Sequence, residues 1–230
     1  MGKNLSKRLS ACLSALSSHS RIADIGTDHA YLPCYGVANG IIDSAIAIDV
    51  VDGPLAQAKA TIADYGLEDK VELRKGSGFE PLEEGEVEGV NIAGMGGKLI
   101  SQLLLDSLSI AESIETLVLQ PQGGEFTLRS VLDENYFKVT NEQLIEEDGI
   151  IYTIITAEPA VFNNTLVYKE LLFGPVLLKN PENELFIKKW QQELGAIDEI
   201  LSQIPDGDER KFEFERKRKL IEDVLAGVGS

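Results

Sequence analysis

The chain of 230 residues has little of the chemistry that builds metal centres or disulfide frameworks. It contains two cysteines, Cys12 and Cys34, and two histidines, His19 and His29. Because no cluster of His or Cys accompanies the two separated cysteines, the pattern indicates neither a zinc site nor a disulfide framework. We therefore expect no metal, and we interpret both cysteines as small buried side chains in a reducing cytoplasm.

Long apolar segments are also missing. No run approaches the roughly 20 apolar residues that a membrane-spanning helix needs. The first residues hold no apolar signal region followed by a small-residue cleavage site. The composition, 43% hydrophobic and 26% charged, is that of a globular protein. We therefore expect a cytoplasmic protein without a membrane partner.

Positive charge is scarce, because 21 Lys and Arg stand against 38 Asp and Glu, which gives a net charge of -17. This balance argues against a uniformly basic surface for nucleic acid. The charge is uneven, with 11 basic and 24 acidic residues in 1–157 but 10 and 14 in 158–230. Six basic residues near the end form one dense cluster: Arg210, Lys211, Arg216, Lys217, Arg218 and Lys219.

The G-x-G-x-x-G motif of dinucleotide-binding proteins is absent, but part of its setting is present. An apolar run at residues 22–25 contains Asp24 and ends at Gly26, which predicts a buried strand, a glycine turn and a helix N-terminus. A second apolar run ends in Asp49, 23 residues after Gly26. An acid at about this distance usually accepts hydrogen bonds from ribose hydroxyls. These spacings predict a nucleotide site.

The residue type after the glycine turn distinguishes between cofactors. Asp28 stands where a further glycine would admit a diphosphate, and its charge would repel that group. The same charge suits S-adenosylmethionine (SAM), whose sulfonium and amino groups are positive. We therefore favour SAM over a nicotinamide dinucleotide. The alternative, an ordinary strand–turn–helix junction without a ligand, is disfavoured by the spacing of Asp24 and Asp49 and by a glycine-rich loop at residues 94–97.

Strand and helix patterns alternate through the first two thirds of the chain. Strands are expected over residues 21–26, 45–49, 70–74, 88–93, 116–120, 136–145 and 150–158, the last two joined by a turn at 147–149. An amphipathic helix is expected over 4–17, with Arg8 on its polar face. We expect it to pack against the sheet, and the alternative is that it helps to shape the substrate cleft. Further helices are expected soon after Asp28, which could cap its helix, from Asp52, over 97–113 and around Phe126. This alternation predicts a mostly parallel sheet with one antiparallel edge strand, the α/β layout of a class I Rossmann-like SAM-dependent methyltransferase.

The C-terminal part changes character. We expect a SAM-binding methyltransferase domain over 1–158, a connector over 159–180 and a helical hairpin over 181–230. Trp190, Leu194, Ile197, Leu201 and Ile204 recur at spacings of four and three, which is typical of a coiled coil. A turn at 205–208 precedes a second helix over 209–226. The hairpin is a candidate RNA-binding arm, and the alternative is a packing or dimerisation element.

Three strings of the sequence resemble one family. The segments A-D-I-G-T-D-H-A-Y-L-P (residues 23–33), N-I-A-G-M-G-G (91–97) and L-Q-P (119–121) are similar to those of the bacterial TrmK family. Members of that family use SAM to methylate N1 of adenine 22 in tRNA. The resemblance covers the whole chain, and it implies a Rossmann-like domain with a C-terminal coiled coil that helps to hold tRNA.

The resemblance also implies positions for site residues. Gly26 would lie against the methionine part of SAM, with Asp28 and His29 near it, and Asp49 would hold the ribose. The cofactor-binding residues would be Asp24, Gly26, Asp28, His29, Asp49, Ser77, Gly78, Ala93, Gly94, Met95 and Gly96. The substrate-binding residues would be Tyr31 and the six basic residues Arg210, Lys211, Arg216, Lys217, Arg218 and Lys219.

The chemistry fits a site with few catalytic groups. Adenine N1 has an in-plane lone pair that can attack the methyl group directly, so alignment contributes much and a general base is not required. An acid near the base would stabilise the positive charge that develops, and Asp28 is the first candidate for this catalytic role. Its alternatives are a helix cap or a ligand of the SAM amino group. A paired target base must flip out, and Tyr31 or Phe79 could stack on it.

Two other functions stay open at this point. The acidic body would also suit a SAM-dependent methyltransferase that acts on a small molecule. A non-catalytic SAM-binding module could use the hairpin as a docking arm. We expect tRNA as the partner and a monomer or weak dimer.

Overall fold

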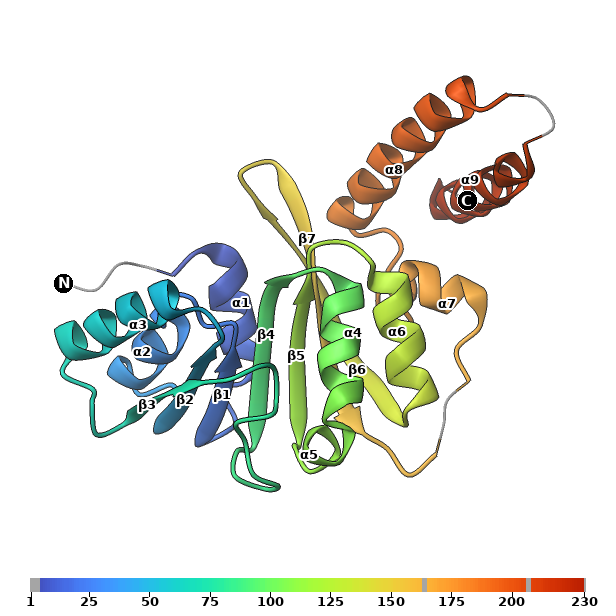
Figure 1. Cartoon of the computed structure of the whole chain (residues 1–230). Helices are drawn as coiled ribbons and strands as arrows, with labels where there is room; N and C mark the ends of the chain where they lie inside the picture. Colours follow the sequence, from blue (N-terminus) through green and yellow to red (C-terminus); the bar gives the residue numbers. More distant parts are fainter. Residues whose placement is uncertain (1–4, 163–164, 206–207, 230) are drawn as a thin grey trace.

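Seven strands form a single sheet in the computed structural model, which describes residues 5–162, 165–205 and 208–229. The strands are β1 (Arg21–Ile25), β2 (Ser44–Asp49), β3 (Val71–Lys75), β4 (Gly89–Met95), β5 (Thr116–Pro121), β6 (Phe137–Glu147) and β7 (Ile150–Pro159). Their spatial order is β3-β2-β1-β4-β5-β7-β6 (Figure 1). β7 is antiparallel to both of its neighbours, so the antiparallel strand lies one place inside the edge, which β6 occupies.

Helices cover both faces of the sheet (Figure 1). On one face α1 (Lys7–Ala15), α2 (Tyr31–Ala38) and α3 (Asp52–Tyr65) share an apolar cluster with β1 and β2. On the other face α4 (Gly97–Asp106), α5 (Leu108–Glu112) and α6 (Glu125–Glu134) share a second cluster. Neighbouring residues of β1 alternate between the two, since Ile22 belongs to the first cluster and Ala23 to the second. Both faces of the central strands are therefore buried, as their apolar sequences predict.

Two expectations about helices were wrong in detail. The helix expected over 97–113 is broken at Ser107, whose φ of -140° ends α4 before α5 begins. The helix after β1 begins at Tyr31, and its N-cap Ala30 is left-handed with no side-chain cap hydrogen bond. Asp28 therefore does not cap this helix.

The C-terminal region has its own apolar cluster. It contains α7 (Tyr168–Phe173), the 3₁₀ turn η1 (Leu177–Lys179), α8 (Glu184–Gln203) and α9 (Glu209–Ala226), which the 3₁₀ turn η2 (Gly227–Gly229) follows. Trp190 and Ile197 on α8 are buried with Ile221 and Val224 on α9. In Figure 1 both helices project from the sheet domain. The two long helices are confirmed, whereas their packing as a coiled coil and the domain boundaries at 158 and 180 stay predictions.

Candidate active site

A cavity of about 350 Å³ opens where β1, β2 and β4 end. The carboxyl ends of parallel strands are where open α/β sheets bind ligands. The lining residues come from α1, from the loop after β1 and from the ends of β2 and β4: Arg8, Leu9, Asp24, Gly26, Thr27, Asp28, His29, Tyr31, Leu32, Asp49, Asn91, Ala93, Gly94 and Met95.

Gly26 brings the loop after β1 close to the end of β4. Its φ is +70°, a conformation that favours glycine. A Cβ at this position would lie 2.2 Å from the Met95 methyl carbon. The N–H groups of Gly26 and Thr27 donate to the Ile48 carbonyl at 2.8 and 2.9 Å. The turn is thereby held against the end of β2, where Asp49 stands.

Asp49 accepts two backbone hydrogen bonds at the mouth of the cavity. Its Oδ2 receives the Asp28 N–H at 3.2 Å, and its Oδ1 receives the Val51 N–H at 3.0 Å. The carboxylate therefore has a fixed direction at the tip of β2. This is the position at which an acid accepts ribose hydroxyls in nucleotide-binding sheets.

Asp24 is a buried acid beneath the cavity. Burial raises the pKa of its carboxyl above the ordinary value of 3.8, while hydrogen bonds from Thr27 and Asn91 oppose that shift and Asp49 adds to it. Thr27 Oγ1 donates to Oδ2 at 2.6 Å, and Asn91 Nδ2 donates to Oδ1 at 2.7 Å. The Asn91 Oδ1 has no hydrogen-bond partner among the described residues, although it is buried. The site thus presents an acceptor to a ligand that carries donors.

Asn91 was not among the expected ligands, and neither was Arg8. The helix over 4–17 was expected to pack against the sheet, with a part in shaping the substrate cleft as the alternative, and Arg8 and Leu9 do line the cavity. Arg8 Nη1 donates to Gln120 Oε1 at 2.5 Å, and the same oxygen accepts the Gly94 N–H at 3.1 Å. Helix α1 thereby places a guanidinium beside the end of β4. An amphipathic pattern alone carries no signal for this contact.

Asp28, His29 and Tyr31 form the rim. Asp28 has a φ of +53°, and its side chain is 67% exposed. Its Oδ2 lies 3.5 Å from His29 Nε2, and the imidazole stacks on the Tyr31 ring with 5.3 Å between centroids. A carboxylate and two rings from the loop after β1 and the first residue of α2 therefore line the cavity together.

Some expected residues lie outside the lining of this cavity. Ser77, Gly78 and Gly96 do not line it, so their expected contacts with SAM stay predictions. Phe79 has no exposed surface and packs in the core under the sheet, so it cannot stack on a target base in this structure. In the sequence, Phe79 follows a glycine turn, as a residue at the rim of the cavity would. Only its packing in the core shows that it is not a rim residue.

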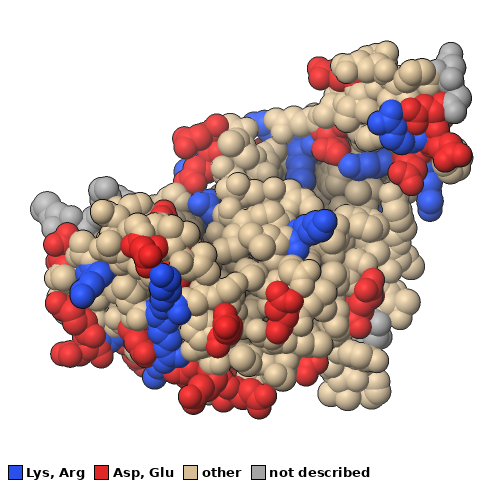
Figure 2. Space-filling view, viewed as in Figure 1, with Lys and Arg blue, Asp and Glu red and all other residues tan. Residues whose placement is uncertain are grey.

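The six basic residues of α9 lie in the projecting C-terminal region, away from the cavity lining, and several pair with acids. Arg210 pairs with Asp208 at 2.7 Å. Lys217 pairs with Glu193 at 2.5 Å, Arg218 with Asp198 at 2.6 Å, and Lys219 with Asp223 at 3.3 Å. Figure 2 shows blue and red side chains intermingled on this arm. The dense cluster in the sequence is therefore not a uniformly positive surface.

Metal ligands and membrane-spanning helices are both missing from the part of the chain that the structure describes. Within 5–162, 165–205 and 208–229 no group of three or more His, Cys, Asp or Glu is arranged to hold a metal ion. No helix among these residues is long and apolar enough to cross a membrane.

The sheet order and the acidic cavity at the strand ends define a class I SAM-dependent methyltransferase. The chain belongs to the TrmK family, described as tRNA (adenine(22)-N(1))-methyltransferase, whose model matches residues 22–227. A Bacillus subtilis (strain 168) protein described in the same words is 35% identical, covering 96% of this chain and 97% of the relative.

Solved structures agree with this assignment. A Streptococcus pneumoniae putative tRNA (m1A22) methyltransferase in complex with SAM has a TM-score of 0.89 and 35% identity, covering 96% of this chain and 100% of its own. M. capricolum TrmK in complex with S-adenosylhomocysteine has a TM-score of 0.87 and 26% identity, covering 97% of this chain and 99% of its own. The match includes the C-terminal helices in both cases.

Proposed function

We infer that this protein transfers a methyl group from SAM to N1 of adenine 22 in tRNA. Membership of the TrmK family carries this conclusion. The acidic cavity is consistent with it, because SAM brings two positive groups and an adenosine to a site that Asp24, Asp28 and Asp49 line.

Four residues of the cavity would hold SAM. Asp49 would accept the ribose hydroxyls, as its place at the tip of β2 supports. Asn91 Oδ1, which has no partner among the described residues, would accept a hydrogen bond from the amino group, and Asp24 lies beside Asn91. Arg8 is the cation of the lining and would face the carboxylate of the ligand. SAM, when bound, supplies an electrophilic methyl group.

The rim residues would receive the base. Adenine N1 needs no general base because its lone pair attacks directly, so positioning contributes most. The Tyr31 ring, already stacked on His29, would extend that stack to the flipped adenine. Asp28 would stabilise the positive charge that the base acquires.

The decisive experiment is transfer of labelled methyl from SAM to tRNA, followed by nucleoside mass spectrometry. We expect N1-methyladenosine in a tRNA with adenine at position 22 and none in the same tRNA with guanine there. Intact SAM binding without transfer to any tRNA would exclude the proposal and favour a small-molecule acceptor or a non-catalytic module.

We further propose that the protein works in the cytoplasm, where its tRNA substrate is, as a monomer or weak dimer. Sedimentation at micromolar concentrations would test the oligomeric state, and a tight dimer would contradict this proposal.

A further inference from the structure

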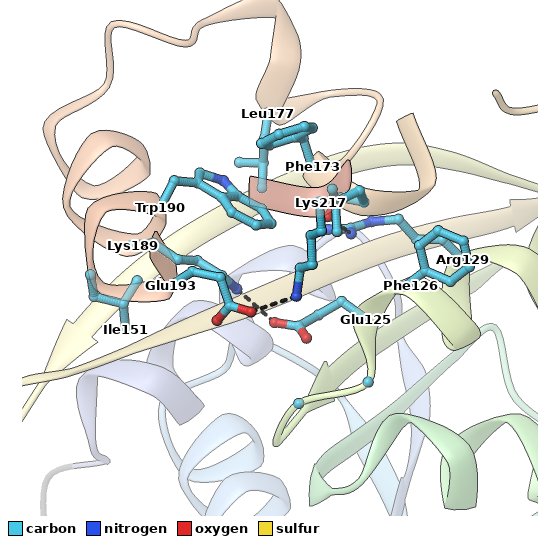
Figure 3. Close-up of a pocket in the computed structure, with 13 residues that line it drawn as sticks. Glu125, Phe126, Arg129, Ile151, Phe173, Leu177, Lys189, Trp190, Glu193 and Lys217 are labelled. Carbon is cyan, nitrogen blue, oxygen red and sulfur yellow. Dashed lines mark hydrogen bonds and ion pairs between the residues drawn. The ribbon is translucent and has the colours of Figure 1, made fainter. Parts of the chain in front are cut away.

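Two adjoining cavities lie where the C-terminal helices meet the sheet domain. The outer cavity, of about 410 Å³, is lined by Phe126, Tyr168, Leu172, Phe212, Glu213, Phe214, Arg216 and Lys217. The inner cavity, of about 430 Å³, is shown in Figure 3. Phe126, Leu172 and Lys217 line both, so the two cavities adjoin each other. We call the pair the junction groove, and each part is large enough for a nucleotide.

The outer cavity is rich in accessible aromatic rings. Phe212 on α9 is 70% exposed, although a large apolar side chain is normally buried. Tyr168 on α7 is also exposed, and its ring contacts Phe126 with 5.2 Å between centroids. Aromatic faces of this kind stack on nucleobases without regard to sequence.

Arg216 adds a cation to these rings. Its guanidinium lies 4.7 Å from the centroid of the Tyr168 ring, and no carboxylate lies within ion-pair distance of it among the described residues. By contrast, Arg210, Lys217 and Arg218 each pair with an acid. A guanidinium stacked on a ring keeps its N–H groups available to a phosphate, so the groove combines stacking with a charge for the RNA backbone.

The inner cavity borders a loop that is hydrogen-bonded to residues beside the SAM cavity. Its floor includes Gly123 and Gly124, and the Gly123 carbonyl accepts the Gly97 N–H at 2.8 Å. The Gln122 N–H donates to the Met95 carbonyl at 2.8 Å, and Met95 lines the SAM cavity. The loop that carries these bonds therefore separates the junction groove from the site of methyl transfer.

The mouth of the inner cavity offers both donors and acceptors. Lys189 Nζ donates to Glu125 at 2.6 Å and to Thr153 at 2.7 Å, while Lys217 pairs with Glu193. Figure 3 shows the two ammonium groups and the two carboxylates converging below Trp190 and Phe173. Such a mixed set suits the edge of a nucleobase, which itself carries donors and acceptors, better than an isolated anion.

We propose that the junction groove binds a nucleotide of the substrate tRNA other than the methylated adenine. Its base stacks on Phe212, and its phosphate contacts Arg216, which lies over the Tyr168 ring. This proposal rests on the proposed function. It attributes tRNA binding to an aromatic groove and not to the net charge of α9.

The test is tRNA affinity at fixed salt, measured by filter binding with purified full-length variants. Phe212→Ala should weaken tRNA binding about 5- to 100-fold, the range of one lost base stack. Phe212→Tyr, which keeps the ring, should bind as the wild type does. Phe162→Ala is the matched control, because Phe162 is 80% exposed and lines neither cavity. SAM affinity should be unchanged in all three variants.

A salt series separates stacking from charge. Arg216→Ala should lower the slope of log affinity against log salt by about one, whereas Phe212→Ala should leave it unchanged. If Phe212→Ala binds tRNA as the wild type does, the junction groove does not stack on an RNA base and the proposal is wrong. In that case methylation by the wild type would still stand. Loss of methylation in the wild type itself would instead exclude the proposed function.

Discussion

The guanidinium of Arg129 and the carboxylate of Glu142 form an ion pair that the fold removes from water. Their Nε and Oε1 atoms are 2.8 Å apart, and the side chains are 2% and 0% exposed. Arg129 Nη1 also donates to the carbonyls of Leu171 and Leu172, while Glu142 Oε2 accepts the Val176 N–H at 2.9 Å. The pair thereby fixes the segment that follows the sheet to α6 and β6.

Glu142→Gln should destabilise the protein by about 3–5 kcal/mol, because it leaves the Arg129 charge buried without a counter-charge. Urea denaturation would measure this loss. Glu146→Gln is the matched control, since Glu146 forms an exposed ion pair with Lys188. Exposed pairs contribute only about 0–1 kcal/mol. Equal effects of the two substitutions would show that the buried pair does not hold the segment.

The same ion pair explains why the sequence predicts only a connector over residues 159–180, where Pro159, Gly174 and Pro175 interrupt the pattern. The strands and most helices could be predicted because their apolar periodicity is local. The attachment of α7 depends on Arg129 and Glu142, which are far from it in the chain, and no local pattern encodes such a contact.

Gly26→Ala should weaken SAM binding and also lower stability by about 1 kcal/mol, since an L-residue at positive φ is strained. The loss of binding follows from the Met95 methyl, which a Cβ would displace toward the cavity. Gly40→Ala is the control, because Gly40 has a similar φ of +65° and a Cβ there would meet nothing within 4 Å. Calorimetry with SAM should show a loss for Gly26→Ala alone, and equal affinities in both variants would contradict the close contact.

Asp24→Asn should weaken SAM binding while it raises stability at neutral pH. Folding raises the pKa of the Asp24 carboxyl. The contribution of this carboxyl to stability is therefore fully present below its unfolded pKa, near 3.8, where the group is protonated. That contribution is lost as pH rises through the folded pKa. The variant has no such titration. Asn91 can rotate its amide so that its Oδ1 accepts from the new side-chain amide.

The stability difference between Asp24→Asn and the wild type should therefore grow as pH rises above about 4. Urea midpoints from pH 4 to 8 would measure it, and Asp43→Asn on the surface gives the baseline. If this stability difference shrinks as pH rises, the hydrogen bonds to the Asp24 carboxyl lower its pKa by more than burial raises it.

In the candidate site, as in the fold, some features could be predicted from local sequence and others depend on packing between distant elements. The placement of Asp24, Gly26 and Asp49 around one cavity could be predicted, because they lie at or near the carboxyl ends of two strands and parallel strands bring these ends together. The position of Arg8 in the site could not be predicted, because its place beside Gly94 depends on how α1 packs across the sheet. The pairing of the α9 cations with acids of α8 likewise depends on packing between the two helices.

Asp28→Asn should lower kcat about 10- to 100-fold, which corresponds to about 1.4–2.7 kcal/mol of lost stabilisation of the positive base. The fold should persist, because asparagine tolerates positive φ and the Asp28 N–H that binds Asp49 belongs to the backbone. Asp148→Asn is the matched control, since Asp148 has a φ of +52° in the turn between β6 and β7.

Steady-state kinetics with SAM and tRNA varied separately would distinguish the two roles of Asp28. A lower kcat with the KM for SAM unchanged indicates an interaction made in the transition state. A higher KM for SAM with kcat unchanged would mean that the carboxylate only holds the SAM amino group.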